Sequence, residues 1–78
     1  MGYFVKAKIG INLKRLRKEK GLSRRQAADY CDVTEQFIGL LERGESIPGA
    51  YVMFQLAELY ECSVEDFIVW RKGVEKTC

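Results

Sequence analysis

The side chains that most often carry out chemistry are scarce in this sequence. It contains no histidine, and its three cysteines, Cys31, Cys62 and Cys78, are far apart. Without histidine the chain lacks the base of Ser-His-Asp and Cys-His catalytic groups, and the cysteine spacing fits neither a zinc site nor a disulfide framework. We expect Cys31 and Cys62 to be small buried hydrophobes and Cys78 to be a free thiol. These features predict a protein that is not an enzyme and that needs no metal or cofactor.

The charged residues are distributed unevenly along the chain. Residues 1–25 contain nine Lys and Arg residues and one acid, a charge of +8, whereas residues 26–78 contain four bases and ten acids, a charge of −6. A cluster of basic side chains on one part of a small domain suits a polyanionic partner such as nucleic acid. A solvated helix face produces the same pattern, so charge alone does not choose between these interpretations.

Length and composition bound the class of protein. With 78 residues, 47% of them hydrophobic, the chain has room for one domain, which we place at 1–78 with a core at 9–70 and terminal extensions at 1–8 and 73–78. No apolar run approaches the ~18 to 20 residues that cross a bilayer. The first ten residues, MGYFVKAKIG, lack the apolar stretch of a secretory signal. We therefore expect a cytoplasmic protein without a membrane partner.

Short segments with helical periodicity predict an all-α fold of five helices. The apolar residues that recur at helical spacing are Ile9, Leu13 and Leu16 in the first segment, Ile38 and Leu41 in the third, and Met53, Leu56, Ala57 and Tyr60 in the fourth. Gly21 and Gly44 follow the first and third segments and are predicted to end those helices, since glycine is common after a last turn. Residues 3–7 show only a weak strand-like alternation.

Capping residues indicate where the other helices begin. Ser23 and Gln26 have the S-x-x-Q spacing of a capping box, so a second helix is predicted to start there and to run to about residue 30 or 31. Thr34 is a good N-cap for a third helix, and Ser63 is one for a fifth helix that ends near Lys72. The break between the second and third helices is therefore short.

The second and third predicted helices have faces that suit close packing. Ala27 and Ala28 have small side chains that let another helix approach, although plain helix propensity also explains them. At about 100° per residue, Ile38 and Leu41 face inward and Glu42 lies at the edge of the third helix. The residues predicted to face outward are Gln36, Gly39, Leu40 and Arg43.

Two short helices joined by a tight turn, with a polar outward face on the second, indicate a helix-turn-helix from about Ser23 to Arg43. The chain from Ile9 to Ile68 resembles the phage-repressor and Cro type of helix-turn-helix domain, the XRE family. The matching segments are IGINLKRLRKEKGLS at 9–23, Ala28, VTEQFIGLLERG at 33–44, Pro48 and LAELYECSVEDF at 56–67. The resemblance implies a lambda-repressor-like domain whose third helix enters the DNA major groove. It also implies a structural ion pair between Arg17 and Glu42.

The resemblance further implies which residues contact double-stranded DNA. Base readout is expected from Thr34, Glu35, Gln36, Phe37 and Leu40, and phosphate contacts are expected from Ser23, Arg24, Arg25 and Arg43. The amide of Gln36 can bond bidentately to adenine. Glu35 can accept a hydrogen bond from cytosine N4 or repel phosphate, and Phe37 can touch a thymine methyl or pack at the edge of the core. Asp32 stands in the turn where relatives usually have glycine, and its short side chain tolerates left-handed geometry.

The fourth and fifth predicted helices carry more apolar residues than the core of one small domain requires. The surplus residues are Val52, Phe54, Leu59, Val69 and Trp70, and of these Val52, Leu59, Val69 and Trp70 are predicted to form a homodimer interface. The other interpretation is that the termini, including residues 3–5, cover this surface. A two-fold pair would set two reading helices about one DNA turn, roughly 34 Å, apart.

Two classes of function are consistent with these features. The first is a sequence-specific, double-stranded DNA-binding transcriptional regulator that acts as a homodimer and takes no small-molecule ligand. The alternative is a protein-interaction module on the same scaffold, in which Phe37 and Leu40 face a protein partner and DNA contact is weak or absent. The strong dependence of DNA binding on salt distinguishes the two.

Overall fold

The computed structural model describes the backbone of residues 2–68 and the side chains of residues 6–68. This part of the chain contains five helices and no strand: α1 (Gly2–Glu19), α2 (Arg24–Cys31), α3 (Glu35–Glu42), α4 (Ala50–Tyr60) and α5 (Glu65–Ile68). The predicted all-α, five-helix fold is therefore confirmed. The expected end of the last helix near Lys72 and the terminal Cys78 lie outside the described residues. No helix within residues 2–68 combines the length and the apolar character needed to cross a bilayer.

Ser23 and Thr34 cap α2 and α3 as predicted, whereas the Ser63 hydroxyl, near the start of α5, donates to the Asp66 carboxylate at 3.3 Å instead of accepting from a backbone N–H. The hydroxyl of Ser23 accepts a hydrogen bond from the backbone N–H of Gln26 at 3.0 Å, and the Gln26 side chain accepts one from the Ser23 N–H at 2.8 Å. Thr34 Oγ1 accepts from the backbone N–H three residues later at 3.0 Å. The backbone N–H of Ser63 donates to the Asp66 carboxylate at 3.0 Å. These bonds satisfy N–H groups that a helix start otherwise leaves without partners.

The first helix is longer than the sequence pattern indicates. Residues 2–8 continue α1, so the weak alternation at 3–7 does not produce a strand. Lys6, Ala7 and Lys8 are good helix formers, and Ala7 has a tertiary neighbour. A Cβ on Gly44, which has a φ of +76°, would lie 3.0 Å from Ala7 Cα. The loop after α3 therefore packs directly on this first part of α1.

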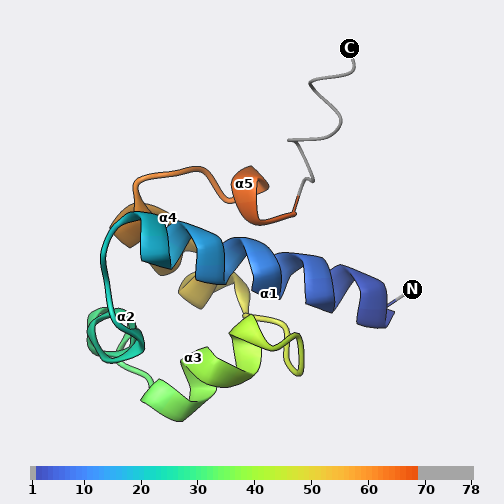
Figure 1. Ribbon diagram of the computed structural model, residues 1–78, viewed down its shortest axis with the longest axis horizontal. Coiled ribbons are helices and arrows are strands. Elements are labelled where there is room, and N and C mark those ends of the chain that lie inside the picture. The colour runs from blue at the N-terminus through green and yellow to red at the C-terminus, as the bar shows by residue number, and fades with distance from the viewer. Residues whose placement is uncertain (1, 69–78) are drawn as a thin grey trace.

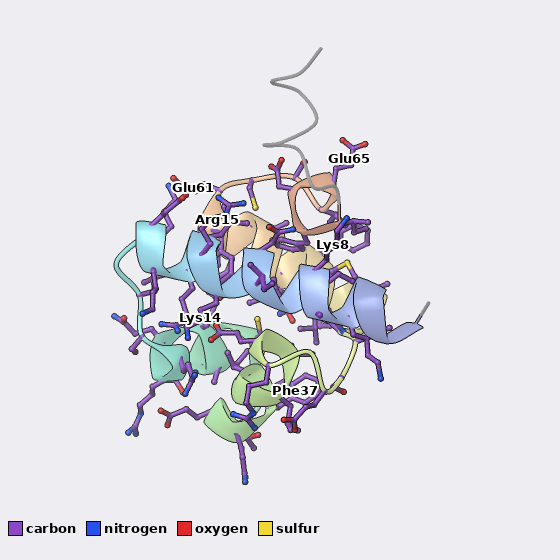
Figure 2. All side chains as sticks on the ribbon, turned by 45° about the vertical axis from the view of Figure 1, so that its right-hand side comes forward. Lys8, Lys14, Arg15, Phe37, Glu61 and Glu65 are labelled. Atoms are coloured by element: carbon purple, nitrogen blue, oxygen red, sulfur yellow. The ribbon has the colours of Figure 1, made fainter. Side chains whose placement is uncertain are left out.

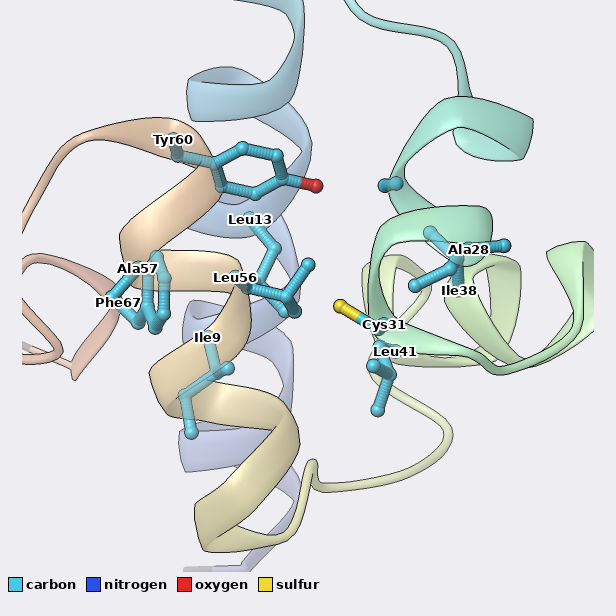
Figure 3. Close-up of a cluster of buried hydrophobic side chains, with 11 residues drawn as sticks. Ile9, Leu13, Ala28, Cys31, Ile38, Leu41, Leu56, Ala57, Tyr60 and Phe67 are labelled. Carbon is cyan, nitrogen blue, oxygen red and sulfur yellow. The ribbon is translucent and has the colours of Figure 1, made fainter.

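Helix α1 lies between the α2–α3 pair and α5. It packs against α3 on one side and α5 on the other, and α2 packs against both α3 and α4. Figure 1 shows α2 and α3 together on one side of α1, with α5 on the opposite side. Figure 3 shows the core between α1, α4 and the α2–α3 pair. Its buried members are Ile9, Leu13, Ala27, Ala28, Cys31, Ile38, Leu41, Leu56, Ala57, Tyr60 and Phe67. The prediction that Cys31 is buried is confirmed, and Cys62 is half-buried against the core.

One buried polar side chain fastens the short helix α5 to α1. Asn12, which is 3% exposed, donates from Nδ2 to the carbonyl oxygen of Phe67 at 2.7 Å. The Phe67 ring also meets Tyr60 edge to face, with ring centroids 6.4 Å apart. A helix of four residues has little stability of its own, so these tertiary contacts hold it in place.

Candidate nucleic-acid interface

The turn between α2 and α3 sets the angle between these two helices. Asp32 adopts φ 58° and ψ 45°, in the left-handed region, and its N–H donates to the carbonyls of Ala28 and Asp29. The N–H of Val33 donates to the Ala28 carbonyl at 3.0 Å. Thr34 then caps α3, so the chain changes direction within three residues. Asp32 adopts the left-handed geometry that its short polar side chain tolerates, as the sequence predicts.

The inner faces of α2 and α3 are fully buried. Ala27 and Ala28 are 0% and 2% exposed, and Ile38 and Leu41 are 1% and 0% exposed. Both alanines of α2 are thus in the core, which agrees with the predicted packing role. The packed pair of helices presents the other face of α3 to solvent.

The carboxylate of Glu42 forms a buried ion pair with Arg17. Arg17 donates from Nε to Oε2 at 2.7 Å and from Nη2 to Oε1 at 3.1 Å, and the Glu42 side chain is 1% exposed. Arg17 Nη1 also donates to the carbonyl oxygen of Leu22 at 2.8 Å. The hydrogen bond with Glu42 raises the pKa of Arg17 above its usual value, although burial acts in the opposite direction. The pair implied by the resemblance is thus present, and it joins α1 to the end of α3.

A second arginine binds the same carboxylate. Arg24 Nε donates to Glu42 Oε1 at 3.3 Å, and 39% of the Arg24 side chain remains exposed. The sequence indicates Arg24 as a phosphate contact but says nothing of this bond, because the partners are 18 positions apart and belong to different helices. Glu42 therefore orients a basic side chain at the surface as well as holding α1 against α3.

A glycine of α1 brings the end of α3 unusually close. A Cβ on Gly10 would lie 2.6 Å from the carbonyl oxygens of both Leu41 and Glu42. No side chain fits there, so Gly10 allows a helix contact that any other residue would push apart. Gly10 is not among the residues predicted from the sequence to have a role. A single glycine within an apolar-periodic helix is the signal that indicates such a contact.

The solvent side of α2 and α3 contains an open hollow of about 510 Å³. Its lining residues are Arg24, Thr34, Glu35, Gln36, Gly39 and Arg43. All of these except Gly39 were predicted to contact DNA, and the structure brings them to one surface. Arg43 donates to Glu45 at 3.1 Å and is 51% exposed. The predicted outward orientation of Gly39 is correct, but the residue is buried because the Arg43 side chain covers it.

The other predicted contact residues lie outside this hollow. Arg25 is exposed on α2, and the exposed Ser23 uses its hydroxyl for the capping box. Phe37 and Leu40 are half-buried, and Phe37 packs against the core. Of the two roles considered for Phe37, packing at the core edge is therefore the one that the structure contains. Leu40 is less exposed than its predicted outward orientation implies, because α3 lies against both α1 and α2.

The acids of α4 and α5 lie away from the α2–α3 surface. Figure 2 shows Glu61 and Glu65 on the side of α1 that is remote from Phe37 and α3. Lys20 donates to Glu61 at 2.6 Å, and this bond lowers the pKa of Glu61. Five other acids belong to α2, α3 and the turns that follow them, namely Asp29, Asp32, Glu35, Glu42 and Glu45. The uneven charge of the sequence therefore does not become a purely basic surface around the hollow.

The predicted dimer residues are only partly available. Val52 and Leu59 are half-buried and pack against the core of their own domain, whereas Val69 and Trp70 lie outside the described residues, as do the side chains of residues 3–5. The large exposed apolar side chains around the start of α4 are Phe54, which is part of the predicted surplus, and Ile47 and Tyr51, which are not. Their exposures are 63%, 49% and 73%.

A short polar-faced helix, held outward by a capped turn on a five-helix scaffold, defines a helix-turn-helix domain. A family model described as helix-turn-helix, HTH_3, matches residues 13–67 of the chain. The protein belongs to this XRE-type family of DNA-binding helix-turn-helix transcriptional regulators. The resemblance identified from the sequence is therefore confirmed.

Individual relatives agree with this assignment. An uncharacterized HTH-type transcriptional regulator from Sinorhizobium fredii is 34% identical over 50 residues, which span 64% of this chain and 65% of that protein. The restriction-modification controller protein C.AhdI from Aeromonas hydrophila superposes with a TM-score of 0.79 at 26% identity, over 85% of this chain and 100% of that one. An HTH_3 family transcriptional regulator from Vibrio cholerae superposes with a TM-score of 0.76 at 34% identity, over 86% of this chain and 38% of that one.

Proposed function

We propose that the protein is a cytoplasmic transcriptional regulator that binds double-stranded DNA sequence-specifically as a homodimer. The observation that carries the proposal is the hollow on the solvent side of α2 and α3, where five polar side chains surround a glycine. Base edges and phosphates are recognised by such hydrogen-bonding groups on a rigid helix. Binding alone, by occluding a promoter or recruiting polymerase, is the mechanism, and no chemical step is needed.

The start of α2 is the proposed phosphate-binding edge. Ser23, Arg24 and Arg25 lie where the helix N-terminus favours an anion. Arg24 uses Nε for Glu42, and neither of its terminal nitrogens donates to another residue within the described chain. These nitrogens are therefore available for a charge-assisted bond to phosphate. Such contacts position the domain on the duplex without reading its sequence.

The first turn of α3 is the proposed base-reading edge. Glu35 and Gln36 are exposed, and their side chains bond to no other residue among those that the structure describes. The Gln36 amide suits adenine, and the Glu35 carboxylate suits cytosine N4. Thr34, at the N-cap, is exposed beside them. Phe37 and Leu40, being half-buried, offer only their edges to a thymine methyl group.

The homodimer is proposed to form through α4. The exposed Tyr51 and Phe54 extend the surface on which the partly buried Val52 and Leu59 lie. Exposed apolar side chains gathered on one helix commonly mark an interaction surface. A two-fold dimer would present two α3 helices to successive major grooves and would bind a near-palindromic site.

Selection of bound duplexes from a random DNA pool tests the proposal directly. We expect a near-palindromic sequence to be enriched, and its binding to weaken with salt at a log-log slope of about −0.9 per phosphate contacted. Arg25→Ala should flatten that slope and weaken all duplexes alike, whereas Gln36→Ala should relax the preference at one base pair. If no sequence is enriched and binding does not depend on salt, the proposal fails and the protein-interaction module becomes the better explanation.

A further inference from the structure

The side chain of Arg43 lies over the outward face of α3, not beyond the end of the helix. A Cβ on Gly39 would lie 3.1 Å from Arg43 Nη1, 3.8 Å from Cζ and 3.9 Å from Nη2. The whole guanidinium therefore lies above Gly39, one helical turn before Arg43 itself. Long side chains on helices lean toward the N-terminus in this way. Because Gly39 has no side chain, the guanidinium of Arg43 has room there.

This placement brings Arg43 among the residues of the proposed base-reading edge. Gly39, Glu35 and Gln36 line the same hollow, and the positions 35, 36, 39 and 43 fall on one face of a helix. The family resemblance implies a phosphate contact for Arg43, which follows the last turn of α3. The position of the guanidinium places it instead beside side chains that face the groove.

Glu45 fixes the orientation of the guanidinium. Arg43 donates from Nε to Glu45 Oε2 at 3.1 Å, and among residues 6–68 neither Nη1 nor Nη2 has an acceptor. The two terminal nitrogens therefore remain as a pair of parallel donors. Two such donors match the O6 and N7 acceptors that guanine presents in the major groove.

We infer that Arg43 is a specificity-determining residue that reads one guanine in the major groove, with Gly39 providing its place and Glu45 orienting it. This inference rests on the proposed function, since it assigns one base of the DNA site. It predicts a guanine at a fixed position of each half-site, next to the bases that Glu35 and Gln36 contact.

The test uses the full chain and the duplex obtained from pool selection, with each guanine replaced in turn by 7-deazaguanine, which lacks N7. At one guanine per half-site, we expect the replacement to weaken binding by the wild-type protein about tenfold. The same replacement should not weaken binding by Arg43→Ala any further, because the partner of N7 is already missing. Arg25→Ala is the matched control, and it should remain sensitive to the replacement.

Gly39→Ala separates base reading from folding. Its new Cβ displaces the flexible tip of Arg43, so preference for that guanine should fall about tenfold. Alanine favours a helix over glycine, so the melting temperature of the variant should rise by about a few degrees. A loss of discrimination together with a gain in stability cannot come from a damaged fold.

Three results would overturn the inference. The first is that Arg43→Ala weakens every duplex by one factor and reduces the salt slope by about 0.9, as Arg25→Ala does, which makes Arg43 a phosphate contact while the regulator proposal stands. The second is that no guanine replacement distinguishes wild type from Arg43→Ala. The third is that the wild-type protein prefers no duplex at all, in which case the proposed function fails as well.

Discussion

Arg17 and Glu42, 25 positions apart, meet through two hydrogen bonds of 2.7 and 3.1 Å. One residue belongs to α1 and the other to the last turn of α3, so the pair determines how far and at what angle α3 stands from the long helix. The proposed DNA contacts adjoin this anchor, because Glu35 lies seven residues before Glu42 on the same side of α3 and Arg24 donates to the Glu42 carboxylate. A buried structural pair and an exposed recognition surface therefore share one helix of eight residues.

Loss of the Glu42 carboxylate should destabilise the domain strongly. Glu42→Ala leaves the guanidinium of Arg17 buried without its partner, and we expect the free energy of unfolding to fall by about 3 kcal/mol. The melting temperature should fall by at least several degrees. Urea denaturation measures the change, with Glu45→Ala as a control whose exposed carboxylate should contribute less than about 1 kcal/mol. Equal stability of the two variants would contradict a structural role for the buried pair.

Gly10 should tolerate no side chain. Gly10→Ala places a Cβ against two backbone carbonyls of α3, so we expect a loss of about 1 to 3 kcal/mol even though alanine favours a helix. Thermal unfolding of Gly49→Ser provides the comparison, because nothing lies within 4 Å of a Cβ at Gly49 and serine is a good N-cap. If Gly10→Ala melts at or above the wild-type temperature, α1 and α3 are not in the close contact described.

Replacing Asp32, the left-handed residue of the turn, with glycine should stabilise the domain. Asp32→Gly removes the steric penalty of a φ of 58° and should raise the free energy of unfolding by about 0.5 to 1 kcal/mol. Asp32→Val should lower it, since a β-branched residue is poorly accommodated there. Paired denaturation curves of the two variants check the signs, and a stabilising valine would refute this description of the turn.

Alkaline pH should weaken the fold in part through Tyr60. Burial raises the pKa of the Tyr60 phenol, the Glu42 carboxylate raises it further, and Arg17 opposes this. A folded pKa above the unfolded value means that the stabilisation is complete below about pH 10 and is lost as pH rises from there, by up to about 1.4 kcal/mol per pH unit. Tyr60→Phe should therefore lose less stability than wild type between about pH 9 and pH 11.

The comparison with Tyr60→Phe isolates one phenol from other titrating groups. Burial also raises the pKa of the Cys31 and Cys62 thiols, but both proteins contain them, so their contribution cancels in the difference. Parallel loss of stability in wild type and variant would mean that Tyr60 ionises as readily in the folded protein as in the unfolded one.

Association through α4 should depend on an exposed aromatic residue. Phe54→Asp should convert the proposed dimer to monomer in sedimentation at tens of micromolar, without unfolding it, because 63% of Phe54 is exposed. Ile11→Asp is the matched control, since Ile11 is 53% exposed on α1, away from that surface. If the wild-type protein sediments only as a monomer, the proposed dimer does not form. If Ile11→Asp dissociates the dimer and Phe54→Asp does not, the interface lies on α1 and not on α4.

Much of the architecture followed from local signals in the sequence. Ser23, Thr34 and Ser63 predict helix starts because a capping bond joins residues only two or three positions apart. The apolar spacing of the third helix separates its buried Ile38 and Leu41 from Gln36, because helical periodicity is also a local property. The family resemblance adds the pair of Arg17 and Glu42, which periodicity alone places only at two helix edges.

The remaining features depend on contacts between distant parts of the chain, so only the tertiary structure decides them. Gly10 is essential because the carbonyls of Leu41 and Glu42 approach it, and Arg24 is oriented by a carboxylate from another helix. Val52 and Leu59 look surplus on a helical wheel, yet the packed domain half-buries both of them. Periodicity assigns a direction to each side chain, but burial depends on which helix faces it. The amino-acid sequence therefore determined the helices and their polar faces, whereas packing determined which side chains remain available to a partner.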